Sequence, residues 1–350
     1  MSATMRAALF RAHGGPEVME VAEVAVPTPG PGEVQVRVKA VALNHIDLWM
    51  RRGLPSMKIA LPHISGGDAC GVVSAVGAGV RGVAEGERVL LNPGMSCGRC
   101  RECLGGRDNL CAEFRMLGEH TDGAMAEHVV VPAANLVKTP PGAARFSDVE
   151  LAAVPITFIT VWHMLVENAR VRPGETVLVL GAGSGVGVAA IQIAKLFGAR
   201  VIAAASTPRK LERARALGAD DTIDYAAEEL VAAVKRLTDR RGADVVVEHT
   251  GAATFPKSVV ACARGGRIVT CGATDGFEAP LNLRHVFWRH LSIMGSTLAS
   301  KACLFEVVDR IAAGQLRPVV DRALPLAEIQ AAHRALEARE AFGKIVLVID

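Results

Sequence analysis

Long apolar runs are missing from this chain, and so is any strong excess of charge of one sign. No stretch of the 350 residues is apolar over the length needed to cross a bilayer, and the first residues lack the apolar core of a signal peptide. The formal net charge is only +3, and no basic stripe carries interleaved aromatic residues. These absences argue against membrane and nucleic-acid binding, and we expect a cytoplasmic protein.

Cysteine is sparse outside one short segment. Four of the 8 cysteines are scattered among apolar neighbours, as buried free thiols usually are. The other four follow the spacing C-x-x-C-x-x-C-x7-C, which suits a tetrahedral zinc site, whereas two disulfides would need an oxidising compartment. Because thiolates fill all four positions, such a zinc is structural and leaves no place for substrate. The predicted zinc ligands are Cys97, Cys100, Cys103 and Cys111.

The hydrophobic pattern changes character along the chain, which is long enough for two domains. Up to about residue 150, alternating runs such as Glu33–Lys39 are separated by Gly- and Pro-rich turns, which predicts a compact, mostly antiparallel β-domain. From about residue 174, apolar strands such as Thr176–Leu180 alternate with helical segments, which predicts a parallel sheet covered on both faces. The last strand, Lys344–Ile349, could return to the first domain. We therefore predict an α/β fold.

A glycine-rich turn follows the first strand of this βαβ pattern. Backbone N–H groups between a buried strand and a helix can hold a pyrophosphate. The literal G-x-G-x-x-G is absent, and the better register is Ala182-x-Ser184-x-x-Gly187. Small residues also serve tight strand–helix packing, which is the structural alternative. The predicted dinucleotide contacts in this turn are Gly183, Ser184, Gly185, Val186 and Gly187.

The end of the second strand of the parallel sheet bears on which dinucleotide binds. An NAD site usually places Asp or Glu there to accept from the ribose 2′-OH. This chain has Ser206, Arg209 and Lys210 instead, and hydroxyl and cationic groups suit a 2′-phosphate. We therefore predict NADPH over NADH. In the alternative interpretation, Arg209 and Lys210 are a solvated first helical turn.

Together these features resemble the medium-chain dehydrogenase/reductase superfamily, which includes zinc alcohol dehydrogenases and quinone oxidoreductases. The resemblance rests on the cysteine lobe, Gly66–Gly71, the Ser184–Gly187 turn and the terminal Gly343-Lys344. It implies a small-molecule substrate and a homodimer or homotetramer. It also implies a GroES-like catalytic domain built from both ends of the chain around a Rossmann nucleotide domain. The expected bounds are 1–155 and 299–350 for the catalytic domain, 92–115 for its zinc lobe, and 156–298 for the nucleotide domain.

The departures from that family concern its second, catalytic zinc. By motif register the places of the three zinc ligands are taken by Asn44, Gly67 and, approximately, Ile156, which cannot form an N, S and O cage for zinc. A different site assembled from His45, His63 and Asp68 remains an open alternative.

Without a Lewis acid, an acceptor that delocalises charge is favoured. We therefore predict NADPH-dependent reduction of a C=C conjugated to a carbonyl, as in an enone or enoyl thioester, or of a quinone. A zinc-dependent alcohol dehydrogenase with rearranged ligands, and a non-catalytic NADPH-binding protein, are the alternatives. The catalytic candidates are Asn44, His45 and Asp47, although Asn44 and Asp47 could also be the cap and first-turn acid of a helix.

Three further residues are candidate cofactor contacts. Thr160 matches the place where the family holds the nicotinamide carboxamide, and Lys344 belongs to the terminal family motif. Tyr225, the only tyrosine, could cover the adenine end. For Thr160 the alternative is a residue of a core helix, and for Tyr225 an ordinary partly buried tyrosine.

Overall fold

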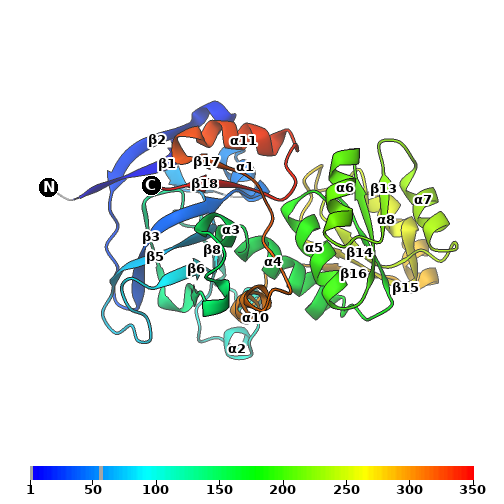
Figure 1. Ribbon diagram of the computed structural model, residues 1–350, viewed down its shortest axis with the longest axis horizontal. Coiled ribbons are helices and arrows are strands. Elements are labelled where there is room, and N and C mark those ends of the chain that lie inside the picture. Colours follow the sequence, from blue (N-terminus) through cyan, green and yellow to red (C-terminus); the bar gives the residue numbers. More distant parts are fainter. Residues whose placement is uncertain (1–2, 55–57) are drawn as a thin grey trace. The chain divides into compact units, whose positions relative to one another are not determined.

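The computed structural model describes residues 3–54 and 58–350. It divides into two compact units, which we call unit 1 (residues 1–156 and 300–350) and unit 2 (residues 157–299). The blue N-terminal and red C-terminal segments both belong to unit 1 (Figure 1). Unit 2 is a single continuous segment of the chain.

The largest sheet of unit 1 combines strands from both ends of the chain. Its order is β10-β6-β5-β3-β18-β17, with β9 also paired to β3. The C-terminal strand β18 runs antiparallel to β3 and parallel to β17. The strands are β3 (Glu33–Ala42), β5 (Asp68–Val76), β6 (Arg88–Leu91), β9 (His128–Pro132), β10 (Leu136–Lys138), β17 (Val320–Pro325) and β18 (Lys344–Val348).

Smaller sheets and short helices complete unit 1. One sheet has the order β2-β1-β4, with strands Met19–Ala25, Thr4–Phe10 and His63–Ile64, and β7 (Gly94–Met95) pairs with β8 (Arg115–Met116). The α-helices are α1 (His45–Arg52), α2 (Arg101–Leu104), α3 (Asp148–Ala152), α10 (Lys301–Ala312) and α11 (Ile329–Glu337). Short 3-10 helices are η1 (Pro16–Val18), η2 (Asp108–Leu110), η3 (Ala133–Asn135), η4 (Pro141–Ala143) and η6 (Leu326–Glu328).

The core of unit 1 follows from period-two alternation in its longest strand. In β3 the side chains of Val34, Val36 and Val38 are buried, while those between them are partly or fully exposed. Successive side chains of a strand point to opposite faces, so this pattern buries one face. Helix α11 adds Ile329 and Ala332 to the same core.

Unit 2 is a parallel sheet with helices around it (Figure 1). Its strand order is β13-β12-β11-β14-β15-β16. The strands are β11 (Thr176–Val179), β12 (Arg200–Ala205), β13 (Asp221–Asp224), β14 (Ala243–Glu248), β15 (Cys262–Thr270) and β16 (Ser292–Gly295). The helices are α4 (Pro155–Trp162, which begins in unit 1) with its π-helical continuation η5 (His163–Asn168), α5 (Gly185–Leu196), α6 (Pro208–Ala216), α7 (Leu230–Leu237), α8 (Phe255–Ala261) and α9 (Leu283–Arg289).

The strand order of unit 2 reverses direction between β11 and β14. From β11 the chain adds β12 and then β13 on one side, and afterwards β14, β15 and β16 on the other. Open parallel sheets of this kind bind ligands beyond the carboxyl ends of the strands at such a reversal. The predicted fold class, a mostly-β domain with a doubly wound parallel-sheet domain, is confirmed. Within the described ranges, no helix is both long and apolar enough to cross a membrane.

Candidate functional site

The start of helix α1 places two of the catalytic candidates together. Asn44 is the N-cap residue in extended conformation, and its backbone N–H donates to Oδ2 of Asp47 at 2.7 Å. Asp47 is buried, and its other oxygen accepts from the N–H of Gly66 at 3.1 Å. The capping interpretation of Asp47 therefore has direct geometric support, while Asn44 and His45 remain partly exposed.

The Asn44 side chain lies against a buried ion pair between the two ends of the chain. Lys344 donates to Oδ2 of Asp68 at 2.9 Å, and both side chains are almost completely buried. Asn44 donates from Nδ2 to the same Asp68 oxygen at 2.9 Å and accepts from Lys344 at 2.5 Å. The N–H of Ile156 donates to the other Asp68 oxygen at 2.5 Å. Asn44, Asp68 and Lys344 thus form one hydrogen-bonded polar cluster.

Burial has a large effect on the acid beside this cluster. Desolvation raises the pKa of Asp47 to about 7, against the opposing effects of the Asn44 N–H and the Lys344 ammonium. The nearby Asp68 carboxylate adds to the rise. A carboxyl with a pKa near 7 changes its charge within the range in which most enzymes work.

Apolar packing fills the place of one expected zinc ligand. A Cβ atom on Gly67 would lie 3.0 Å from Cδ1 of Ile156 and 3.0 Å from the carbonyl oxygen of Leu117. A side chain at Gly67 could therefore enter only if the backbone or Ile156 moved. Neither Asn44 nor Ile156 offers a strong zinc ligand in exchange. The residues present do not fit the family's catalytic metal.

His45, His63 and Asp68 do not come together as a metal site. In the described part of the chain, the four cysteines of the lobe are the only group of candidate metal ligands. His63 instead contacts the carbonyl oxygen of Gly118 through Nε2 at 3.0 Å, and its Nδ1 lies 3.7 Å from Asp122. Asp68 is engaged by Lys344.

The four cysteines of the lobe converge as the spacing predicts. Their sulfur atoms all lie within 4.8 Å of one another, and none of the described cysteines is in a disulfide. Cys103 Sγ is 3.5 Å from Cys100 Sγ and 3.8 Å from Cys97 Sγ. Sulfurs around a tetrahedral zinc, each about 2.3 Å from the ion, lie roughly 3.8 Å apart. Backbone N–H groups of Arg99 and Cys100 lower the pKa of Cys97 to about 6, which favours a thiolate. These residues fit a structural zinc.

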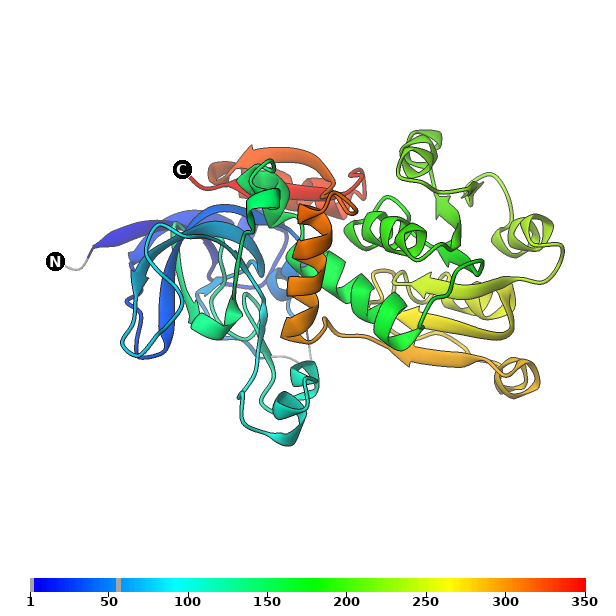
Figure 2. The ribbon, with the colours of Figure 1, turned by 60° about the horizontal axis from the view of Figure 1, so that its bottom comes forward.

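The lobe is joined to helix α10 by one charged contact. Lys301 donates to Asp108 Oδ2 at 2.9 Å and to Ser96 at 2.7 Å, and the Lys301 N–H donates to Asp108 Oδ1. Asp108 therefore caps the N-terminus of α10. Figure 2 shows the lobe, with α2, beside the start of the orange helix α10.

The glycine-rich turn of unit 2 has the geometry expected of a phosphate-binding turn. Ser184 is the N-cap of α5, and its Oγ accepts from the Gly187 N–H at 2.8 Å. A Cβ on Gly187 would lie 2.5 Å from the carbonyl oxygen of Gly181, so only glycine allows this close passage. Gly183 is buried, whereas Ser184, Gly185 and Val186 are partly exposed at the start of α5, where backbone N–H groups are free of helical partners. The residues fit a dinucleotide pyrophosphate.

The residues predicted to determine the preference between NADPH and NADH follow the strand next to this turn. Ala182 donates its N–H to Ala204 at the end of β12, and Tyr225 donates its N–H to Ala205 at 3.2 Å. The residues that follow β12 are Ser206, Arg209 and Lys210, of which Ser206 and Arg209 are exposed and Lys210 is partly buried. Tyr225 is 43% exposed.

Two further cofactor candidates are buried. Thr160 lies in α4 with only 6% of its surface exposed. Lys344 is occupied by Asn44 and Asp68 in unit 1. The cofactor roles of both residues stay predictions.

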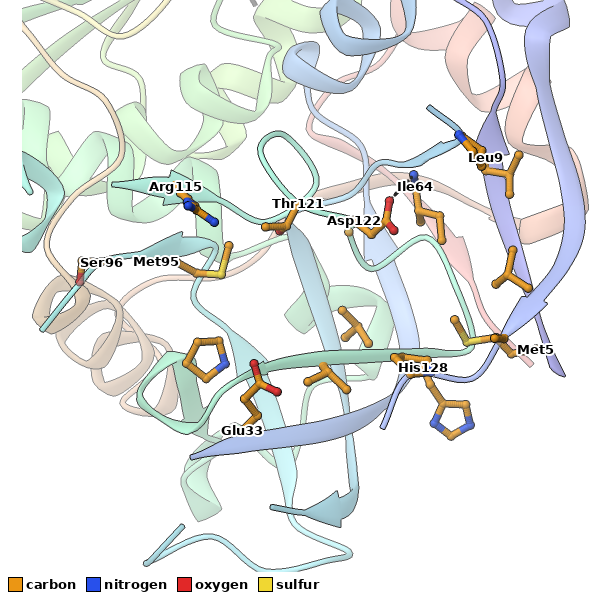
Figure 3. A pocket seen from close by; sticks show the side chains of 18 of the residues that line it. Met5, Leu9, Glu33, Ile64, Met95, Ser96, Arg115, Thr121, Asp122 and His128 are labelled. Carbon is orange, nitrogen blue, oxygen red and sulfur yellow. Dashed lines mark hydrogen bonds between the residues drawn. The ribbon is translucent and has the colours of Figure 1, made fainter. Parts of the chain in front are cut away.

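A separate cavity of about 690 Å³ lies in unit 1 beside the lobe (Figure 3). Its walls include Met5 and Leu9 of β1, Met95, Arg115 and Thr121. Figure 3 also shows Asp122 accepting from the Ile64 N–H. Apart from Cys97, no predicted site residue lines this cavity. The polar cluster around Asp68 is therefore a different place in unit 1.

Two features of the sites were not assigned a role from the sequence. The ion pair of Asp68 with Lys344 joins positions 276 residues apart, although each lies in a motif that carried the family resemblance. His249, at the end of β14, contacts both Ser184 and Leu180. Its position directly after the fourth strand of the parallel sheet is the sequence signal that could have indicated a role in the dinucleotide site.

Together, the parallel sheet with its phosphate turn and the β-rich unit with its polar cluster define a dinucleotide-dependent oxidoreductase. Residues 30–141 match the family "alcohol dehydrogenase GroES-like domain", and residues 185–313 match "zinc-binding dehydrogenase". The chain belongs to the medium-chain dehydrogenase/reductase superfamily. The family and the cysteine cluster support NAD(P) and zinc.

Individual relatives match almost the whole chain. A 2-haloacrylate reductase of Burkholderia sp is 30% identical over 98% of this chain and 98% of its own length. An acryloyl-coenzyme A reductase of Metallosphaera sedula is 32% identical over 98% of this chain and 99% of its own. A crystal structure of an NAD-dependent alcohol dehydrogenase is 55% identical, covers 99% of this chain and 100% of its own, and has a TM-score of 0.95.

Proposed function

We propose that this protein uses NADPH to reduce a C=C conjugated to a carbonyl group, or a quinone, without a catalytic zinc. The observation that carries the proposal is the packing at Gly67, where a side chain would enter only if Ile156 or the backbone of Leu117 moved. Asn44 occupies the place of another ligand and is bound to Asp68 and Lys344. The proposal includes one structural zinc at the cysteine lobe.

The polar cluster supplies N–H groups where a metal would otherwise stabilise charge. NADPH, when bound, supplies the hydride. In the substrate, a hydride added at the β-carbon moves the C=C electron pair toward the carbonyl, and the carbonyl oxygen becomes an enolate until a proton is added at the α-carbon. Asn44 is partly exposed, and its second N–H makes only a 3.4 Å contact with the Ala42 carbonyl. This amide, next to the Lys344 cation, is suited to donate to that oxygen.

The names of two relatives agree with this substrate class. A haloacrylate and an acryloyl thioester both carry a C=C conjugated to a carboxyl-derived group, and each of these relatives matches 98% of this chain. Delocalisation over such a substrate lowers the charge that the protein must stabilise, so a site made of hydrogen-bond donors is sufficient.

A second candidate is oxidation of an alcohol with NAD. It is favoured by the NAD-dependent alcohol dehydrogenase whose structure is 55% identical to this chain. That reaction would need a group to take the place of a Lewis acid beside the alcohol oxygen. Apart from the four cysteines of the lobe, the described part of the chain brings together no group of three or more candidate metal ligands that could play this part.

The deciding experiment measures NADPH oxidation with a panel of enones, enoyl thioesters and quinones, together with NAD reduction by primary and secondary alcohols. Zinc content is measured on the same preparation. We expect turnover with one of the conjugated acceptors and about one zinc per chain. Turnover of plain alcohols with two zinc ions per chain would support the second candidate instead. Tight binding of NADPH without any turnover would support a non-catalytic role.

Replacing Asn44 separates catalysis from helix capping. We expect Asn44→Ala to lower kcat at least tenfold, because one hydrogen bond to a charged group is worth about 1.5–3 kcal/mol. Ser147→Ala is the matched control, since Ser147 caps α3 of the same unit with Glu150 in a capping box. If both variants lose similar thermal stability and neither loses turnover, Asn44 has only the capping role.

The NADPH preference rests on the residues after β12. No acid stands there, and Arg209 is exposed. We expect NADPH to bind at least tenfold more tightly than NADH, and Arg209→Ala to reduce that ratio severalfold. Arg236→Ala, an exposed arginine of α7 paired with Glu228, is the control. Tighter binding of NADH by tenfold or more would overturn the preference.

A further inference from the structure

His249 lies directly beneath the phosphate turn of unit 2. It follows the last residue of β14, the strand beside β11 at the reversal of strand order. Its ring is buried against Gly181, because a Cβ on Gly181 would lie 2.8 Å from Cε1 of His249. Among the described contacts, Ser184 is the only residue of the turn whose side chain contacts His249. Its Oγ lies 3.2 Å from Nε2 of His249.

The contacts of His249 define which of its nitrogens carries hydrogen. Nε2 is 2.9 Å from the carbonyl oxygen of Leu180, and a carbonyl oxygen can only accept. We therefore assign the ring hydrogen to Nε2, which then donates to Leu180. Burial lowers the pKa of His249, which favours the neutral ring.

This arrangement determines the direction of the Ser184 hydroxyl. Its oxygen already accepts the Gly187 N–H at 2.8 Å, and it faces an N–H rather than a lone pair on His249. The Ser184 hydrogen cannot be donated to either neighbour. Within the described contacts of the turn it has no acceptor, so it is left for a ligand above the start of α5.

From these contacts we infer that His249 is a positioning residue of the dinucleotide site, which holds the Leu180–Ser184 turn and orients the Ser184 hydroxyl as a donor to a pyrophosphate oxygen. The inference rests on the proposed dinucleotide-dependent function. It adds a neutral histidine and a serine hydroxyl to the backbone N–H groups that the turn itself supplies. The ligand recognised at this place is the pyrophosphate group, whatever the rest of the dinucleotide.

The carboxylate next to this histidine is already committed to the protein. Glu248 is buried and accepts from the N–H groups of Thr250 and Gly251 and from the hydroxyls of Thr254 and Ser258. Its charge raises the pKa of His249 but does not outweigh burial. The ring therefore acts as a fixed hydrogen-bond donor rather than as an acid or base.

The test measures binding of ADP-ribose and of its 2′-phosphate by calorimetry, which is independent of turnover and of the nicotinamide. We expect His249→Phe, which keeps a ring but removes the donor, to raise Kd about tenfold. His249→Gln retains an N–H donor, so its Kd should lie within about threefold of the wild-type value. Ser184→Ala should resemble His249→Phe.

A double-mutant cycle checks that His249 acts through Ser184. If it does, the Ser184→Ala/His249→Phe double variant binds about as weakly as the weaker single variant, near tenfold. A loss near a hundredfold, the product of two independent effects, would overturn this part of the inference.

The control is His163→Phe, since His163 forms a partly buried contact with Ser296 at 2.7 Å in the same unit. We expect its Kd for ADP-ribose to stay within twofold of wild type. An equal rise in His163→Phe and His249→Phe would show a general loss of packing and overturn the inference. Unchanged binding in a folded His249→Phe would also overturn it while leaving the proposed function intact. If the wild-type protein binds neither ligand, the proposed function fails first.

Discussion

Asn44 and Asp47 show how far neighbouring residues can be understood before the chain folds. They are three positions apart at the start of α1, where the N–H of Asn44 donates to Asp47. This geometry is local, and the capping pattern predicted it. The second partner set of Asn44, made of Asp68 and Lys344, comes from 24 and 300 residues away and has no local signal.

Removing the titratable group at Asp47 should flatten the pH dependence of stability. The folded pKa of Asp47 is raised to about 7 from its ordinary 3.8, so the folded state binds this proton more tightly than the unfolded state. The corresponding stability is fully present below about pH 4 and is lost as the pH rises through 7. Between pH 5 and 7, we expect the free energy of unfolding of the wild type to fall by up to about 1.4 kcal/mol per pH unit relative to that of Asp47→Asn.

Urea unfolding at several pH values measures this difference. Asp47→Asn also loses one acceptor, so a constant offset in the free energy of unfolding is expected and only the slope is diagnostic. Parallel pH profiles for the two proteins would show that Asp47 is ionised in the folded state at all these values.

At the scale of single elements, the cysteine lobe and the start of helix α10 are held together by polar contacts. Lys301 at the start of α10 is bound by Asp108 and Ser96 of the lobe, and Asp108 also accepts the Lys301 N–H. The lobe has little apolar core of its own, since Leu104 and Leu110 are exposed by 77% and 60%. A bound zinc would therefore be the main constraint on its fold.

Loss of the metal should loosen both elements. We expect Cys103→Ser, or chelation of wild type, to remove the zinc and to speed amide hydrogen exchange in residues 96–111 and in the first turn of α10 at least tenfold. Cys303→Ser is the control, because Cys303 is a buried cysteine of α10 that is in no disulfide and lies outside the cluster, so this variant should keep about one zinc. Exchange that speeds up in the lobe alone would show that Asp108 does not transmit the constraint.

Element prediction worked best where the pattern is repetitive. The predicted alternation of apolar strands with helical segments is the observed one, but β15 begins at Cys262, before the stretch from Arg267 that pairs regularly with β14. The early residues of β15 are separated from the rest by an irregularity in pairing with β14, so their pattern does not alternate regularly. Backbone pairing with a neighbouring strand can therefore extend a strand beyond the residues whose side-chain pattern predicts it.

At the scale of the whole molecule, unit 2 exposes several large apolar side chains close together in the sequence. Phe277, Leu283, Phe287 and Trp288 are exposed by 63–69% and lie in or next to α9. Beside them in the chain, β16 is an end strand of the sheet, with one side not paired to another described strand. An exposed edge with apolar neighbours is a typical protein–protein contact.

A second copy of this chain is the partner we expect there. Two β16 strands can pair antiparallel about a two-fold axis, which makes the contact self-complementary. A large aromatic residue buries at most about 150–250 Å², so the three aromatic side chains and Leu283 supply part of the roughly 800 Å² per copy of a stable interface, and pairing of β16 adds to it. We expect wild type to be a dimer or a dimer of dimers by light scattering, and Phe287→Glu/Trp288→Glu to be a monomer.

The control for this prediction is Phe305→Glu. Phe305 is 51% exposed on α10 of unit 1, so a new charge there should leave the oligomeric state unchanged. A wild-type monomer at micromolar concentration would exclude the contact, and dissociation by Phe305→Glu as well would place the interface elsewhere.

Spacing along the chain was sufficient for the features that depend on close neighbours. The cysteine cluster, the phosphate turn, the capped start of α1 and the alternation of strands and helices all involve residues within a few turns of one another, where short-range geometry leaves few alternatives. The burial that raises the pKa of Asp47, the Asp68–Lys344 ion pair, the closed packing around Gly67 and the contact of His249 with Ser184 arose only on folding. Each of these depends on which distant segments meet, because desolvation and exclusion of a ligand are properties of the surroundings and not of the residue itself.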